Sequence, residues 1–250
     1  MTHAKNTAGY HHVNTIPIDI QKQVREDGSI LMHSTIPLEP SPYRLTERLK
    51  HWATVTPEKI FIGRKNARGQ WETLTYAETF TKVQGIAHAL LNKEISAERP
   101  VAILSENSIE HGLMALAALH IGIPYSAIAP AYSLRSKDFK RLQYIIDLLQ
   151  PGLIFVNDAK KYEPALRAIA KATGVVAVTN PISGTNNFLF EDLLNTSLKN
   201  SGDVEAAFNA IQPGTIAKIL FTSGSTGSIK GRADWVMLVR KAPATSLTWP

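Results

Sequence analysis

The chain has 250 residues, of which 44% are hydrophobic and 19% are charged, so its composition is that of a globular protein able to bury a sizeable core. It contains no cysteine, which excludes disulfides, thiolate metal sites and cysteine nucleophiles. The formal net charge is +6, and half of it lies between Thr222 and Pro250, where four cations accompany one anion. Elsewhere no basic stripe with interleaved aromatic residues is visible, so nucleic acid or another polyanion is not the expected partner.

Two stretches bear on location. Residues 1–24 mix charged and apolar positions and lack the continuous apolar run of a secretory signal, so we expect a cytoplasmic chain. The most apolar stretch, residues 112–131, is interrupted by a histidine, a glycine, a proline and a serine. Here the pattern favours a helix followed by a buried strand, and we expect no membrane span.

Short apolar strands alternate with amphipathic helices along most of the chain. Residues 1–44 are expected to form an extended N-terminal segment, because prolines punctuate it without a sustained period. The expected strands are 59–63, 71–74, 100–104, 123–128, 153–156, 175–178 and 215–221, and the expected helices are 45–53, 75–91, 107–119, 136–149 and 162–172. This alternation predicts βαβ units, and hence an α/β fold with parallel sheets flanked by helices.

Some local features are more specific. Thr75 and Glu78 have the spacing of a capping box at a helix start, and Asn107 with Glu110 is expected to start the next helix. Residues 180–213 are polar and contain several glycines and asparagines, so we expect an irregular surface excursion.

The histidines do not predict a metal site. The adjacent His11 and His12 lack a third ligand at ligand spacing, and we expect them on a disordered surface. His88, His111 and His120 fall on or near expected helices and are interpreted as packing residues. No metal-binding residues are therefore proposed.

The strand expected at 215–221 runs directly into a glycine- and hydroxyl-rich loop that ends at Gly231. Loops at the carboxyl ends of strands are where open α/β sheets bind ligands. Small residues expose successive backbone N–H groups that form an anion-binding concavity, and a lysine adds a compact positive charge. These residue types predict a polyphosphate site, whose candidate residues are Thr222, Ser223, Gly224, Ser225, Thr226, Gly227 and Lys230.

Spacing separates this loop from two common phosphate motifs. The P-loop pattern fails because Gly231 follows Lys230 instead of preceding it, and the G-x-G-x-x-G dinucleotide pattern also fails in register. A bland serine- and glycine-rich surface linker is the remaining alternative. A linker rarely follows a buried strand directly, which favours the phosphate site.

The sequence Thr-Ser-Gly-Ser-Thr-Gly-Ser-Ile-Lys-Gly at 222–231 resembles the T-S-G-[ST]-T-G-x-P-K-G signature of the adenylate-forming superfamily, with nine of ten positions in agreement. The resemblance implies an AMP-forming acid–thiol ligase that uses ATP, CoA and Mg²⁺. In that superfamily the loop holds the β- and γ-phosphates while a carboxylate attacks the α-phosphate, giving acyl-AMP and then acyl-CoA. By this resemblance Lys230 neutralises the leaving pyrophosphate, the hydroxyls orient the phosphates, and Gly224 and Gly227 let the backbone approach.

The resemblance extends upstream. Residues 74–78 and 122–130 are similar to an early helix start and a strand of the superfamily. Residues 104–111, 129–134 and 149–155 are most similar to feruloyl-CoA synthases, which implies a hydroxycinnamic acid as the carboxylic acid substrate. The expected fold is therefore the N-terminal part of the adenylate-forming fold.

The pattern breaks after the loop. Isoleucine occupies position 229, where the superfamily has proline, and residues 232–250 match nothing in the family. We expect an extended segment at 1–44, a partial AMP-binding domain at 45–231 and an atypical tail at 232–250, with an out-of-frame origin of the tail as a hypothesis. No complete catalytic set is expected, so the chain alone is predicted to be inactive. The alternative is a non-catalytic α/β domain that binds nucleotide or pyrophosphate weakly, and the oligomeric state stays open.

Overall fold

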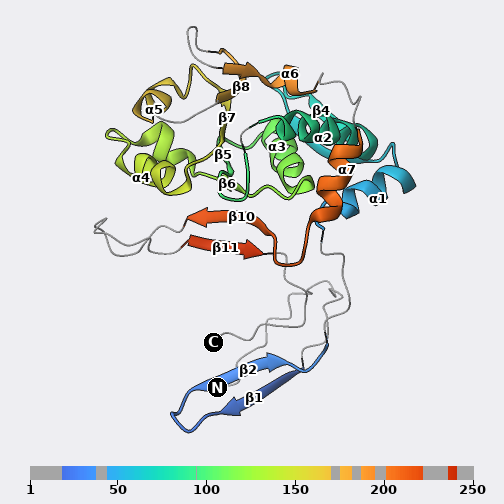
Figure 1. The fold of residues 1–250 in the computed structure, drawn as a ribbon, viewed down its shortest axis with the longest axis vertical. Helices are drawn as coiled ribbons and strands as arrows, with labels where there is room; N and C mark the ends of the chain where they lie inside the picture. Colours follow the sequence, from blue (N-terminus) through green and yellow to red (C-terminus); the bar gives the residue numbers. More distant parts are fainter. Residues whose placement is uncertain are drawn as a thin grey trace, which may run out of the picture. The chain divides into compact units, whose positions relative to one another are not determined.

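A computed structural model describes the chain over residues 19–37, 44–93, 95–169, 175–181, 187–194, 201–221 and 236–240 (Figure 1). The chain divides into two compact units, residues 1–40 with 247–250, and residues 41–246. In the first unit β1 (Ile20–Val24) and β2 (Ile30–Ser34) pair as an antiparallel hairpin whose residues are all exposed. The sequence predicted only an extended segment here and missed this hairpin.

The second unit is built on a seven-stranded sheet in the order β11-β10-β6-β5-β7-β8-β9. Neighbouring strands are parallel except for the antiparallel pair of β10 and β11. The strands are β5 (Val101–Leu104), β6 (Tyr125–Ala127), β7 (Leu153–Asp158), β8 (Val175–Thr179), β9 (Asn187–Leu189), β10 (Ile216–Phe221) and β11 (Val236–Arg240). The predicted α/β fold with a parallel sheet flanked by helices is confirmed.

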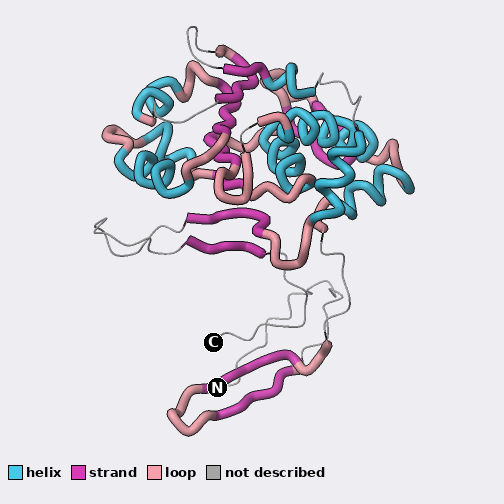
Figure 2. The backbone as a smooth tube through the Cα atoms, viewed as in Figure 1, coloured by secondary structure: helices cyan, strands magenta, loops and turns pink. Residues whose placement is uncertain are grey.

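Helices cover both faces of this sheet (Figures 1 and 2). On one face lie α2 (Tyr76–Leu91) and α3 (Ile109–His120), and on the other lie α4 (Lys140–Leu149) and α5 (Glu163–Ala168). Because side chains alternate along a strand, β5 contributes Val101 and Ile103 to the core under α2 and α3, and Ala102 and Leu104 to the core under α4 and α5.

The start of α2 is the predicted capping box. The Glu78 backbone N–H donates to Thr75 Oγ1 at 3.2 Å, and the Thr75 N–H donates to Glu78 Oε2 at 2.8 Å. The predicted start of α3 at Asn107 is wrong by one residue. Ser108 has extended backbone dihedrals and its Oγ accepts from the His111 N–H at 3.0 Å, so the serine is the N-cap.

Before α2, the chain forms a helix and two strands where they were predicted, α1 (Glu47–Val55), β3 (Ile60–Lys65) and β4 (Trp71–Thr75). The two strands pair as an antiparallel hairpin. The turn depends on Asn66, whose Oδ1 accepts from the backbone N–H groups of Arg68 and Gln70 at 3.0 Å each. Gly69 takes a φ of +75° there, which glycine adopts without steric cost.

The irregular surface excursion expected at residues 180–213 is wrong, because much of this segment is ordered and buried. It contains β9, α6 (Phe190–Leu194) and α7 (Ser201–Ala210). Phe190 and Phe208 are only 2% and 4% exposed. The apolar residues lie three to four positions apart on short helices, and the polar residues between them hid this pattern.

The helix predicted at 136–149 also differs. A π-helical turn, η1 (Ala131–Arg135), comes first, and α4 starts only at Lys140. Phe139 takes a φ of +51°, which breaks the helix. Side chains of the preceding residues bind the backbone instead: Ser136 Oγ accepts from the Phe139 N–H at 3.1 Å, and Asp138 Oδ1 accepts from the Lys140 N–H at 3.3 Å.

The most apolar stretch forms the predicted helix and strand, since α3 ends at His120 and β6 begins at Tyr125. Among the described residues no helix combines the length and the apolar character needed to cross a bilayer. His120 is a packing residue, as predicted, with 1% of its surface exposed. His11 and His12 lie outside the described residues.

Candidate functional site

The candidate phosphate loop follows the carboxyl end of β10. Phe221, the last residue of β10, is the cross-strand partner of Val236, the first residue of β11, so the connection leaves and re-enters the sheet at the same point. On its other side β10 lies parallel to β6. All seven candidate residues fall in this connection and lie outside the described residues: Thr222, Ser223, Gly224, Ser225, Thr226, Gly227 and Lys230.

The described residues around this end of β10 form an apolar support. Ile219 and Phe221 of β10 pack against the same core as Tyr132 of η1 and Phe139. The guanidinium of Arg141 lies 4.7 Å from the centre of the Tyr132 ring, a cation–π contact that fixes η1 against α4. The end of β10 is therefore packed against η1 and the residues that precede α4.

A topological switch point lies two strands away from β10. After β5 the chain turns to α3 on one face, and after β7 it turns to α5 on the other face. Between two such strands the connecting loops diverge, and the crevice at their carboxyl ends is the usual ligand site of open α/β sheets. The residues that follow β5 and β7 are therefore a second place where polar chemistry can gather.

Polar side chains do meet at this switch point. Glu106, two residues after β5, forms an ion pair with Lys161, which follows β7. Behind them Tyr162 is 0% exposed, and its hydroxyl has no hydrogen-bond partner among the described residues. Burial, together with the negative charge of Glu106, raises the pKa of Tyr162 to about 12.

The surroundings fix these groups further. Asp158 Oδ1 accepts from the Lys161 backbone N–H, and its Oδ2 accepts from Asn180 Nδ2, each at 3.0 Å. On α3, burial lowers the pKa of His111, while the Glu106 carbonyl 3.4 Å from its Nδ1 opposes that shift. Glu106 and Lys161 are thus paired, and the Asp158 carboxylate accepts two hydrogen bonds from neutral donors. Among the described residues no group of three acidic or histidine side chains could hold a metal ion.

Glu106, Lys161 and Tyr162 are not among the site residues predicted from the sequence. Their signal was their position two to six residues after the expected strands at 100–104 and 153–156. That position points to the carboxyl edge of the sheet, but their proximity depends on β5 and β7 being neighbours, which sequence alone did not establish.

Comparison with known proteins decides the family. The model of the family described as AMP-binding enzyme matches residues 49–237. The chain belongs to the AMP-binding enzyme family. This match runs from α1 into β11, so it includes the sheet edge and the candidate loop.

The curated relatives share less than 30% sequence identity with this chain. Tyrocidine synthase 3 of Brevibacillus parabrevis is 27% identical over 220 residues, which are 88% of this chain and 3% of that protein. A 4-chlorobenzoate–CoA ligase of Arthrobacter sp is 28% identical over 159 residues, which are 63% of this chain and 27% of the ligase.

Solved structures give the same fold. ATP-bound MatB from Rhodopseudomonas palustris superposes with a TM-score of 0.58 at 23% identity, covering 80% of this chain and 35% of that structure. A luciferase-like enzyme from Zophobas morio has a TM-score of 0.58 at 19% identity, covering 76% and 43%. This AMP-binding enzyme chain therefore spans less than half the length of these relatives.

Proposed function

We propose that the chain contributes the phosphate-binding part of an AMP-forming carboxylic acid–CoA ligase. The observation that carries the proposal is the position of the candidate loop, which starts at the carboxyl end of β10, a strand parallel to β6 within the segment that matches the AMP-binding family. In this role Lys230 neutralises the developing charge on pyrophosphate, and the hydroxyls of Thr222, Ser223, Ser225 and Thr226 orient the phosphates. ATP, Mg²⁺ and CoA are the cofactors that the proposed reaction requires.

The proposed acid is an aromatic one, specifically a hydroxycinnamate such as ferulate. Residues 104–111, 129–134 and 149–155 support this choice through their similarity to feruloyl-CoA synthases. The relative from Arthrobacter sp is named for a ligase of 4-chlorobenzoate, also an aromatic carboxylate. Acyl-AMP formation followed by transfer to CoA is therefore proposed for the complete protein in which this segment functions.

A calorimetric titration of the chain with MgATP and with pyrophosphate tests the loop. We expect both ligands to bind, and Lys230→Ala to weaken binding about tenfold or more, because a hydrogen-bonded charge on phosphate is lost. Lys22→Ala is the matched control, since this exposed lysine lies on β1 and not at the carboxyl edge of the seven-stranded sheet. Equal affinities of the two variants would contradict the assignment of the loop.

Hydroxamate trapping with ATP and ferulate tests the activity itself. We expect no hydroxamate from residues 1–250 alone, and turnover by this chain would overturn the expectation that the catalytic set is incomplete. The tail has its own test in the nucleotide sequence after codon 231. If neither alternative frame encodes a helix and further adenylate-forming motifs, the out-of-frame origin proposed for residues 232–250 is wrong.

A further inference from the structure

The β3–β4 hairpin has one face turned to the protein and one turned away. Arg64 and Glu72 are cross-strand partners on the inner face, where Arg64 reaches α3. The outer face is formed by three alternate cross-strand pairs, with a β-bulge between Ile60 and Ile62. These are Ile60 with Thr75, Gly63 with Thr73, and Lys65 with Trp71.

Trp71 forms a flat platform on this outer face. Its ring lies beside Gly63, because a Cβ atom added to that glycine would be 3.5 Å from Trp71 Cε3 and 3.0 Å from Thr73 Cγ2. Lys65 Nζ is 5.5 Å from the centre of the indole ring. Although Trp71 covers the glycine, 66% of its own surface stays exposed. A structural role as cover for Gly63 thus leaves most of the indole available to a partner.

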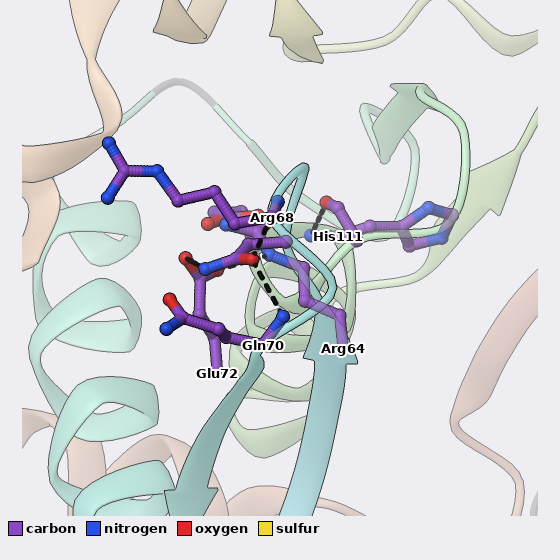
Figure 3. A network of polar contacts seen from close by, with 8 residues as sticks. Arg64, Arg68, Gln70, Glu72 and His111 are labelled. Carbon is purple, nitrogen blue, oxygen red and sulfur yellow. Dashed lines mark hydrogen bonds and ion pairs between the residues drawn. The ribbon is translucent and has the colours of Figure 1, made fainter.

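Polar contacts hold the hairpin from its inner face and within its turn (Figure 3). Arg64 Nε donates to Glu72 Oε2, and its Nη1 donates to Glu110 Oε2 at the start of α3, both at 2.9 Å. Hydrogen bonding to Glu72 is the main cause that raises the pKa of Arg64. With the turn fixed by Asn66, the outer face is presented in one conformation and loses little entropy on binding.

Exposed apolar side chains continue from the hairpin to α1. Tyr76 links the two elements, since its ring lies 5.0 Å from Phe61 and 6.5 Å from Trp52 between centres. Ile60, at the start of β3, and Val55, at the end of α1, are 59% and 55% exposed. Exposed apolar groups of this size in succession are typical of a surface that meets a partner.

The same segment is strongly basic. Residues 44–75 contain seven lysines and arginines and three glutamates, a net charge of +4 compared with +6 for the whole chain. Lys59, Lys65 and Arg68 are exposed, and the ion pairs of the described residues do not include them. Their charge is complementary to an anionic surface, so the expectation that no basic stretch with interleaved aromatic residues lies outside residues 222–250 is wrong for residues 44–75.

We propose that the outer face of the β3–β4 hairpin binds anionic phospholipid membranes peripherally, with Trp71 and Lys65 at its turn end, Arg68 in the turn and Lys59 at the opposite end. A tryptophan flanked by cations is the composition that favours the boundary between headgroups and acyl chains. Because Gly63 has no side chain, the surface beside Trp71 is flat. A flat surface suits a membrane better than it suits a peptide, which needs a groove.

Sedimentation of the chain with vesicles tests this proposal. We expect binding to vesicles of phosphatidylcholine with phosphatidylserine, weak binding to phosphatidylcholine alone, and loss of binding as salt shortens the screening length from about 10 Å at 0.1 M. Lys65→Ala and Arg68→Ala should each lower the partition coefficient about fivefold, because each substitution removes one cation. Trp71→Ala should lower it as well, and Trp71→Phe less.

The matched control is Lys137→Ala with Lys160→Ala, two exposed lysines outside the hairpin. This control should keep the wild-type partition coefficient, and urea unfolding of every variant should show that the fold is retained. Equal binding to both vesicle types, absence of binding, or equal loss in control and hairpin variants overturns the proposal. Trp71-dependent binding to polyglutamate without vesicle binding also overturns it, in favour of an acidic protein partner.

Discussion

Thr46 Oγ1 lies 2.9 Å from His120 Nδ1, and both side chains are almost completely buried. The contact joins the start of α1 to the end of α3. The His120 ring also lies 4.8 Å from the Phe208 ring and 5.7 Å from the Phe80 ring, between centres, so helices α1, α2, α3 and α7 meet at one histidine. A polar pair inside such a cluster contributes to stability because neither partner can turn to water.

Thr46→Val tests the value of this pair. The substitution keeps the shape of the side chain but leaves His120 Nδ1 buried without its hydroxyl partner, so we expect a loss of about 1–3 kcal/mol in the free energy of unfolding. Thr46 makes no side-chain capping hydrogen bond, so the loss reports on the histidine. Urea unfolding gives the difference, and Thr54→Val on exposed α1 surface should cost at most about 0.5 kcal/mol.

Local rules predicted the elements whose signal lies in neighbouring residues. The Thr75 and Glu78 capping box depends on contacts within three positions, and the structure confirms it. The irregular surface excursion predicted at residues 180–213 was wrong, because α6 and α7 are short and polar residues surround their apolar positions. Their helical state depends on burial of Phe190 and Phe208 against other elements, which composition alone does not show.

Phe208→Ala tests whether α7 belongs to the core. Phe208 is 4% exposed, lies against His120, and has the Arg44 guanidinium 4.9 Å from its ring centre. Truncation should lower the free energy of unfolding by about 3–5 kcal/mol through lost burial and the cavity left behind. Ala206→Ser on the exposed side of α7 is the control. If both substitutions had a similarly small effect on the free energy of unfolding, α7 would not belong to the core, and the prediction of a surface excursion would hold for this segment.

The capping box of α2 allows a graded test. Thr75→Ala removes the acceptor of the Glu78 N–H and should cost about 1 kcal/mol in the free energy of unfolding. Thr75→Ser keeps an acceptor hydroxyl and should recover most of that loss, and Glu78→Gln should be tolerated because glutamine also completes the box. Thermal or urea unfolding measures all three. Equal destabilisation by alanine and serine would mean that packing of the threonine methyl group, and not capping, sets the cost.

The candidate site was predictable to different degrees. The glycines, hydroxyls and Lys230 lie in one run of sequence, so their spacing alone distinguished them from other phosphate motifs. The contact of Glu106 with Lys161 joins positions 55 residues apart. It depends on the order of strands in the sheet, with β7 placed beside β5, and that order is a tertiary property.

Tyr162 gives a pH-dependent prediction. Its pKa is raised from about 10 to about 12 by burial and by Glu106, so the folded protein keeps a proton that the unfolded chain loses above pH 10. Stability from this group is therefore unaffected below pH 10 and falls as the pH rises towards 12. Ultraviolet titration of tyrosinate, together with urea unfolding at several pH values, measures both effects.

Tyr162→Phe is the matched variant, because it removes only a hydroxyl that has no partner among the described residues. Removing a buried unpaired hydroxyl relieves a desolvation cost, so the variant should be as stable as wild type, or slightly more stable, near neutral pH. It should also lose less stability than wild type between pH 10 and pH 12. A clear destabilisation at neutral pH would instead show that the hydroxyl has a partner, and the nearest candidate is the backbone of Glu106.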